Sequence, residues 1–402
     1  MSQLTVQAEK YDTRLAIILA LIVAIMPFSL DTYLPAIPAI ARDLITDIHL
    51  IEKTLGIFLF SAAIGQLVGG PLSDTKGRKP IALIGLGIYS VGSLSIYLST
   101  TVEQLLFLRA IQAFGAGMAS VTVSAMVRDI YSGAQAARFY ALIGIIMMIA
   151  PLISPLVGAI LLEQLGWRAI FIFLFGYGIL MLMLTSLKVQ ETNNHRQKLE
   201  QKFISRLIQS YLMVFKKKKA LGFLFFQSFS FCSMFAFLTE SPFVYMEIFG
   251  IAPSEYPFYF AVNIITMAIF NRITAYKLKN SDPMSLYKIG IAVQLLSNTI
   301  LFSCAAAGIL TLPIAIATIM FSVGSQGLIV ANSMALYMEY FDENSGSANA
   351  IMGTTQYLLA GTVGIITTIL HDGTFIPMTL MMFLSTLTGL LLLYYFTLRQ
   401  AP

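Results

Sequence analysis

Charged residues are scarce in this chain: 11% of its 402 residues are Asp, Glu, Lys or Arg, whereas 57% are hydrophobic. A soluble domain has too little interior to bury so large an apolar share. Cysteine and histidine are also rare, with two and three copies. Cys232 and Cys304 fall inside apolar runs, and His49, His195 and His371 fall in connecting segments. We therefore expect neither a disulfide framework nor a metal site.

Catalytic signatures are missing as well. The sequence shows no nucleophile constellation, metal cluster or phosphate-binding loop, and the apolar runs leave no room for a soluble catalytic domain. We therefore expect no enzyme and no cofactor. The net charge of +5 follows from basic residues near the apolar runs, so it predicts membrane topology and no nucleic-acid partner.

Long apolar runs are what the chain has in abundance. A helix needs about 20 apolar residues to cross a bilayer. Twelve runs approach or exceed that length, roughly at 15–38, 51–71, 80–100, 104–127, 138–162, 168–187, 220–246, 254–276, 285–308, 311–337, 347–369 and 375–397. The sequence thus predicts an all-α polytopic membrane protein, with its first span retained.

Basic residues predict the orientation of these spans. They gather in alternate connections, namely at Lys10, Arg14, Lys76, Arg78, Lys79, Arg128, Arg138, Lys277, Lys279 and within 188–219. The other connections carry little beyond Arg42, Lys53 and Arg168. By the positive-inside rule, we expect both termini in the cytoplasm and a lipid bilayer around the spans.

The longest polar interval divides the spans into six and six. We expect an N-terminal bundle over 1–187, a cytoplasmic linker over 188–219 and a C-terminal bundle over 220–402. Within the linker, 203–215 could form an amphipathic helix on the inner leaflet. Lys216–Lys219 reads first as a positive-inside anchor, with lipid recognition as the alternative.

The sharpest local motif is "GGPLSDTKGRKP", which joins the second and third spans. Its glycines permit close helix approach and positive φ, and its charges can pair across an interface that opens and closes. We expect it to act as a conformational latch through Gly70, Asp74, Gly77, Arg78 and Lys79.

These residues resemble motif A of the major facilitator superfamily. "LRAIQAFGAG" resembles motif B of that family, with Arg109 and Gln112 in register, and "APLISPLVGA" resembles its antiporter motif C. The resemblance implies twelve helices in two six-helix bundles around a central cavity. In the last motif, prolines bend the helix and a glycine admits a neighbour, through Pro151, Ser154, Pro155 and Gly158.

Further stretches, "LDTYLPAIP", "GQLVGGPLSD", "RDIY" and "PFVYMEIFGIAP", resemble the Bcr/CflA group of bacterial drug exporters. That resemblance implies proton-coupled efflux of small amphipathic molecules across the bacterial inner membrane by a monomer that alternates access. Export of an endogenous metabolite, such as an amino acid or siderophore, is the main alternative. Uptake by proton symport is disfavoured by the antiporter motif, and a receptor or scaffold that transports nothing would not need Asp31, Arg109 and the latch together.

Charged residues within the spans are the candidate coupling groups, because burying them is costly. Counting about 1.5 Å of helix per residue from the end of each span, we expect Asp31 and Arg109 to lie at a similar depth in the membrane. Asp31 is expected to bind a proton or cation, or else to form a structural ion pair with Arg109, directly or through water.

Other polar and aromatic residues could line the cavity. Glu240 reads as a solvated rim residue, with a second cation-attracting site as the alternative. Some neutral residues could instead join helices by hydrogen bonds. The remaining candidates for substrate contact are Tyr33, Gln66, Gln112, Phe235, Asn263, Asn332 and Gln356.

Overall fold

A computed structural model describes residues 13–131, 133–193, 214–278, 282–341 and 345–400. Across these residues every regular element is a helix, and twelve helical segments are long and apolar enough to cross a membrane. The prediction of an all-α polytopic protein is therefore confirmed. The predicted amphipathic helix falls mostly outside the described residues, and His195 lies wholly outside them.

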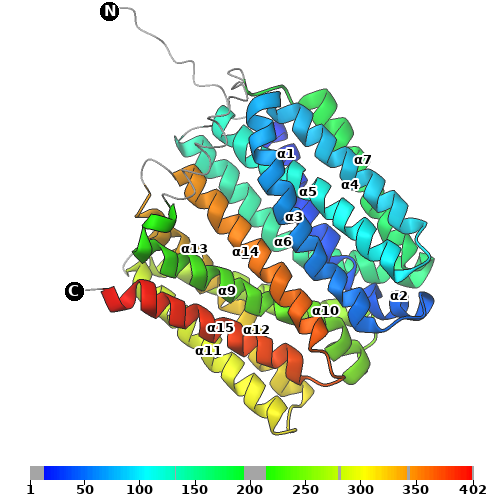
Figure 1. Cartoon of the computed structure of the whole chain (residues 1–402), viewed down its shortest axis with the longest axis vertical. Coiled ribbons are helices and arrows are strands. Elements are labelled where there is room, and N and C mark those ends of the chain that lie inside the picture. The colour runs from blue at the N-terminus through cyan, green and yellow to red at the C-terminus, as the bar shows by residue number, and fades with distance from the viewer. Residues whose placement is uncertain (1–12, 132, 194–213, 279–281, 342–344, 401–402) are drawn as a thin grey trace, which may run out of the picture.

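The first half of the chain forms one bundle, drawn from blue to green in Figure 1. Within it α3 packs against α5, α5 against α4, and α4 against α7, while α1 packs against α6. Its elements are α1 (Thr13–Asp31), η1 (Leu34–Ala36), α2 (Ile37–Asp43), α3 (Ile48–Lys76), α4 (Arg78–Tyr97), α5 (Val102–Ile130), α6 (Gly133–Leu165) and α7 (Arg168–Lys188).

The second half forms the other bundle, drawn from green to red in Figure 1. Here α9 packs against α15 and α14, α11 against α13 and α15, and α10 against α12. Its elements are α9 (Lys218–Pro242), the π-helical turn η2 (Phe243–Ile248), α10 (Tyr256–Lys277), α11 (Pro283–Ala306), α12 (Leu312–Gly324), α13 (Gln326–Met338), α14 (Ser345–Ile369), α15 (Ile376–Phe396) and η3 (Leu398–Gln400).

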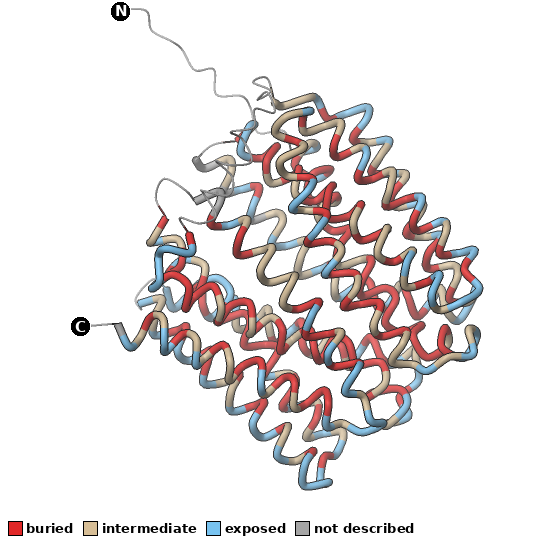
Figure 2. The backbone as a smooth tube through the Cα atoms, in the orientation of Figure 1, coloured by how far each residue is buried: buried red, intermediate tan, exposed pale blue. Residues whose placement is uncertain are grey.

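The two bundles meet along a few helices. α3 packs against α14, α6 against α10, and α2 touches η2. In Figure 2 the buried positions follow the helix faces that meet one another, whereas exposed positions face outward. Many exposed side chains are large and apolar, such as Val91 and Leu180, as expected for a surface that faces lipid.

Small residues allow the tightest helix contacts in the first bundle. A Cβ at Gly65 would collide with the backbone carbonyl of Phe114, and a Cβ at Gly117 would collide with that of Ala62. These glycines lock α3 against α5, as small residues do between membrane helices.

The first span differs from its prediction in one important respect. We expected a continuous helix over 15–38, but α1 ends at Asp31 and a short 3-10 turn, η1, follows. Pro35 explains the break, since it has no backbone N–H to donate to the carbonyl of Asp31 four residues earlier. Asp31 therefore lies at a helix end.

Candidate functional site

A cavity of about 470 Å³ lies between the two bundles. Its volume is typical of sites for small organic molecules. Most of its wall is apolar, with Met, Phe and Leu side chains, and a few polar groups face it. Its lining comes from α1, α3, α5, α6, α9 and α14, and the polar or charged members are Asp31, Gln66, Ser120, Ser124, Arg128, Tyr140, Asn349 and Tyr357.

A smaller cavity of about 170 Å³ adjoins the first. Asp31, Met147 and Pro151 line both cavities, and α10 closes the smaller one with Asn263 among its residues. The carboxylate of Asp31 thus lies where the two cavities meet.

Asp31 is buried, with 5% of its surface exposed. Among the described residues, no side chain or backbone group forms a hydrogen bond or ion pair with its carboxylate. The alternative that Asp31 and Arg109 form a direct structural ion pair is therefore wrong for this conformation.

Arg109 has a different set of partners. Its side chain is fully buried, and both terminal nitrogens donate to the backbone carbonyl of Ser29 at 3.2 Å. It also donates to Gln112 Oε1 at 2.8 Å. Its guanidinium carbon lies 4.7 Å from the ring centroids of both Tyr33 and Phe58, a cation–π geometry. Arg109 thus fixes the backbone two residues before Asp31.

The predicted cavity residues divide into two groups. Gln66 and Phe235 line the larger cavity, and Asn263 lines the smaller one. Five others line neither cavity, namely Tyr33, Gln112, Glu240, Asn332 and Gln356.

Local packing explains why Tyr33, Gln112 and Asn332 line neither cavity. Tyr33 lies under Arg109, and Gln112 is buried between Arg109 and Ser93, to which its amide donates at 2.7 Å. Asn332 donates to the Leu328 carbonyl of its own helix at 2.7 Å. The neighbour of Gln356, Tyr357, lines the cavity instead, so the predicted face of α14 is wrong by one residue.

Sequence reasoning also missed lining residues at one end. Arg128 is assigned above to a connection on the strength of its charge, yet it lies in the last turn of α5 and lines the cavity. Asn349 and Tyr140 line it too, from the second turn of α14 and the third turn of α6. Their polarity near span ends was the available signal.

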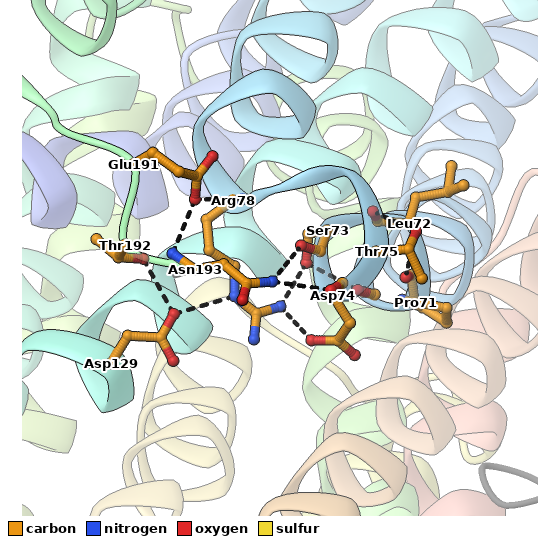
Figure 3. Close-up of polar contacts among 11 residues, drawn as sticks. Pro71, Leu72, Ser73, Asp74, Thr75, Arg78, Asp129, Glu191, Thr192 and Asn193 are labelled. Atoms are coloured by element: carbon orange, nitrogen blue, oxygen red, sulfur yellow. Dashed lines mark hydrogen bonds and ion pairs between the residues drawn. The ribbon is translucent and has the colours of Figure 1, made fainter. Parts of the chain in front are cut away.

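The predicted latch lies beside that end of the cavity, because Arg78 pairs with Asp129, the neighbour of the lining residue Arg128. Figure 3 shows the polar contacts of the latch. Arg78 forms ion pairs with Asp74 and with Asp129, the latter at 3.2 Å, and its backbone N–H donates to Glu191 Oε1 at 2.9 Å. Lys79 donates to the carbonyl of Ser186 at 2.7 Å. Of these partners, Asp74, Asp129 and Ser186 belong to the first bundle, and Glu191 lies just after its last helix, α7.

The two latch glycines have different roles. Gly77 has φ of 109°, and a Cβ there would meet the Glu191 carboxylate. Gly70 has only Val121 near it, at 3.8 Å, so the expected close approach is wrong there. Gly69 makes that approach instead, since its Cβ would lie 2.9 Å from Met118 Cα.

The antiporter-motif helix, α6, contacts α1 just beyond Asp31. A Cβ at Gly158 would collide with the backbone carbonyl of Thr32. Pro151 and Pro155 both lie inside the helix, and each removes a backbone donor. The Ser154 hydroxyl donates to the Ala150 carbonyl at 2.6 Å, a bond made within the helix. The motif therefore shapes the wall that faces Asp31.

The opposite end of the interface is closed by contacts between the bundles. Arg42 and Glu247 form an exposed ion pair at 3.5 Å, and Glu52 of α3 accepts from the backbone N–H of Phe243 at 3.2 Å. Glu240 is 1% exposed, so the expectation of a solvated rim residue is wrong. Its carboxylate lies 3.0 Å from Nδ1 of His371, and this hydrogen bond raises the pKa of His371 above its ordinary value.

Comparison with known proteins agrees with this architecture. The chain is 29% identical over 374 residues to a bicyclomycin resistance protein homolog of Haemophilus influenzae, covering 93% of this chain and 94% of that one. It is 40% identical over 168 residues to a chloramphenicol resistance protein of Pseudomonas aeruginosa, covering 40% of each chain. The structure of a D-xylose–proton symporter superimposes with a TM-score of 0.75 at 15% identity, covering 96% and 98% of the chains, and this likeness shows the fold alone.

The family model of the Major Facilitator Superfamily matches residues 19–365, which is most of the chain. The matched region includes the latch, both cavities and nearly all of α14. The chain therefore belongs to the Major Facilitator Superfamily of membrane transporters.

Proposed function

We propose that this transporter exports small amphipathic molecules from the bacterial cytoplasm in exchange for protons. The observation that carries the proposal is the buried Asp31 carboxylate, which has no partner among the described residues and lies where two cavities meet between the bundles. The names of the two similar resistance proteins support export of antibiotics.

The cavity wall suits such substrates. Methionine and aromatic side chains adapt to varied apolar shapes, and Met26, Met147, Met234 and Phe235 line the larger cavity. The few polar groups would orient a molecule that carries one polar end. A chain with these walls would accept a class of molecules in preference to a single compound.

Proton coupling would follow from changes in the solvation of Asp31. A carboxylic acid loses its proton more readily in water than in an apolar environment. Alternating access would expose Asp31 to each side in turn and let a proton load and leave. Inward proton movement supplies about 2.3 kcal/mol per 100 mV of membrane potential.

The proposed orientation places the latch end in the cytoplasm. The cavity extends from Asp31 to Arg128, whose neighbour Asp129 pairs with the latch residue Arg78, while the far end is closed. Their positions in the chain put several lysines near the same end, as the positive-inside rule requires of a cytoplasmic face, namely Lys79, Lys188 and Lys216–Lys219. In this orientation the described conformation is open inward.

Everted membrane vesicles test the proposal. Adding a transported drug should release protons from the vesicle lumen, as reported by a pH-sensitive dye, for a panel that includes chloramphenicol and bicyclomycin. Asp31→Asn should reach the membrane in normal amounts and lose this signal. Asp282→Asn is the matched control, because that exposed carboxylate makes no capping hydrogen bond. An unchanged signal in Asp31→Asn would overturn the coupling role, and no response to any drug would favour export of a metabolite.

A further inference from the structure

Three side chains with metal-binding atoms gather at the closed end of the interface. Glu52 comes from α3 of the first bundle, Glu240 from α9 of the second, and His371 from the connection between α14 and α15. One ligand atom from each lies within 4.8 Å of the other two. Glu52 is fully buried and Glu240 is 1% exposed.

The polar contacts of this cluster leave two oxygens without partners. Glu240 Oε2 bonds with His371 Nδ1 at 3.0 Å, and Glu52 Oε1 accepts from Phe243 N–H at 3.2 Å. Among the described residues, Glu52 Oε2 and Glu240 Oε1 have no hydrogen-bond partner. Buried carboxylate oxygens without partners are costly, and no lysine or arginine forms an ion pair with either residue within the described part of the chain.

The donor set identifies the class of ion that could satisfy these oxygens. Two carboxylates and one imidazole suit Zn²⁺, which binds such ligands at about 2.0–2.2 Å and takes water in a fourth, tetrahedral position. Calcium and magnesium prefer a shell made of oxygen ligands alone, so the imidazole of His371 favours zinc over both. Two ligand atoms at about 2.1 Å from a tetrahedral Zn²⁺ lie about 3.4 Å apart, so side-chain movements of about 1 Å would bring the three ligand atoms together.

We propose that Glu52, Glu240 and His371 bind a zinc-type divalent cation that ties the two bundles together at their closed end. The site takes ligands from both bundles, so it exists only while this end is closed. Within the second bundle, Phe243 packs edge-on against His371 with ring centroids 4.4 Å apart, and Phe249 packs on Phe375 at 5.2 Å. Three contacts join the two bundles here and are called the seal below: the Glu52–Phe243 hydrogen bond, the Arg42–Glu247 ion pair, and the stacking of His49 on His371 with ring centroids 5.0 Å apart. A ligand that binds one conformation shifts the population toward it. Zinc should therefore hold the transporter in the described conformation and inhibit it.

Metal binding can be tested on the purified full-length chain in detergent, without any transport assay. Calorimetry should show one saturable Zn²⁺ site, and Co²⁺ at the same site should give the visible absorption of tetrahedral coordination. Glu52→Gln and Glu240→Gln should each weaken binding by about tenfold or more. Glu255→Gln is the matched control, since that carboxylate lies at the start of α10, is exposed and makes no capping hydrogen bond.

His371 offers a variant that distinguishes ligation from folding. His371→Ala should lose binding, whereas His371→Cys should regain it with a cobalt–thiolate charge-transfer band. Wild-type protein without saturable Zn²⁺ binding would overturn the proposal, and so would equal affinity in wild type and Glu52→Gln. The absence of tetrahedral Co²⁺ absorption in the wild type would overturn it too, even if the variants fail to fold.

Inhibition of transport by zinc rests on the proposed alternating access, and it is measured in a separate assay. Zn²⁺ supplied to the face that carries the seal should reduce drug-driven proton movement in the wild type, and a chelator should restore it. Glu52→Gln should be insensitive to zinc at the same concentration. Zinc binding without inhibition would overturn the tie between the bundles, whereas a chain that binds zinc but moves no drug would overturn only the proposed function.

Discussion

At the scale of single residues, Arg109 shows what depth estimates along a helix can and cannot predict. The sequence places Asp31 and Arg109 in one bundle at similar depth, and both are indeed buried. It could not predict that Arg109 bonds to the Ser29 carbonyl and lies over two aromatic rings, because those contacts depend on how α1, α3 and α5 rotate. Glu240 is a similar case. The sequence places it near the end of α9, but it could not predict that α3 of the other bundle packs over that end and buries it.

These contacts give a prediction about the coupling of the two residues. Arg109→Gln should destabilise the protein by about 2–4 kcal/mol, because it removes the charged hydrogen bonds to the Ser29 carbonyl and the cation–π contacts with Tyr33 and Phe58. Asp31→Asn should change stability by less than about 1 kcal/mol, since no described residue pairs with its carboxylate.

The measurement is a double-mutant cycle on thermal unfolding in detergent. The coupling energy should stay below about 0.5 kcal/mol, the level of independent sites. A coupling of about 3 kcal/mol, as expected for a broken buried ion pair, would contradict the contacts described for Arg109.

At the scale of elements, the crossing of α6 over α1 depends on one missing side chain. The motif in α6 could be found from the sequence, with its prolines and Gly158. Its partner could not, because the break after Asp31 that presents the Thr32 carbonyl comes from Pro35 in another helix segment. The sequence also cannot tell which face of α3 meets α5. It predicts close packing at Gly70, whereas Gly69 is the residue that lies against Met118.

Gly158→Ala should therefore destabilise the transporter and distort the wall near Asp31. The new Cβ would meet a backbone oxygen that cannot swing aside, so we expect a loss of about 1–3 kcal/mol and reduced drug-driven proton movement. Gly176→Ala in α7 is the control, because nothing lies within 4 Å of a Cβ there. Equal melting temperatures for the two variants would show that α6 and α1 do not make this contact.

At the scale of the whole molecule, the sequence predicts the number of spans well and their arrangement poorly. Each span carries its own apolar run, so twelve crossings follow from local composition. The cavity and the seal depend on which helices of the two bundles meet, such as α3 with α14 and α6 with α10. Glu52 illustrates the difference, since it looks like an unremarkable acid near a span start until Glu240 and His371 lie beside it.

The proposed orientation and the inward-open conformation can be tested together by labelling single cysteines. With Cys232 and Cys304 replaced by serine, Ser186→Cys at the latch end should react with a membrane-impermeant maleimide only in everted vesicles. Thr100→Cys, exposed at the other end of α5, should react only in right-side-out vesicles. The opposite pattern would reverse the assigned topology.

Two further positions report the conformation. Ser124→Cys lines the cavity near Arg128, so it should react from the latch side and be protected by a bound drug. Ser241 is fully buried near the seal, and its hydroxyl forms a hydrogen bond with Tyr256, so a cysteine at this position should react slowly from either side. An excess of Zn²⁺ should slow Ser241→Cys further and leave Ser124→Cys unchanged, because the ion would close only the far end. Rapid labelling of Ser241→Cys with a protected Ser124→Cys would mean that the resting transporter opens outward.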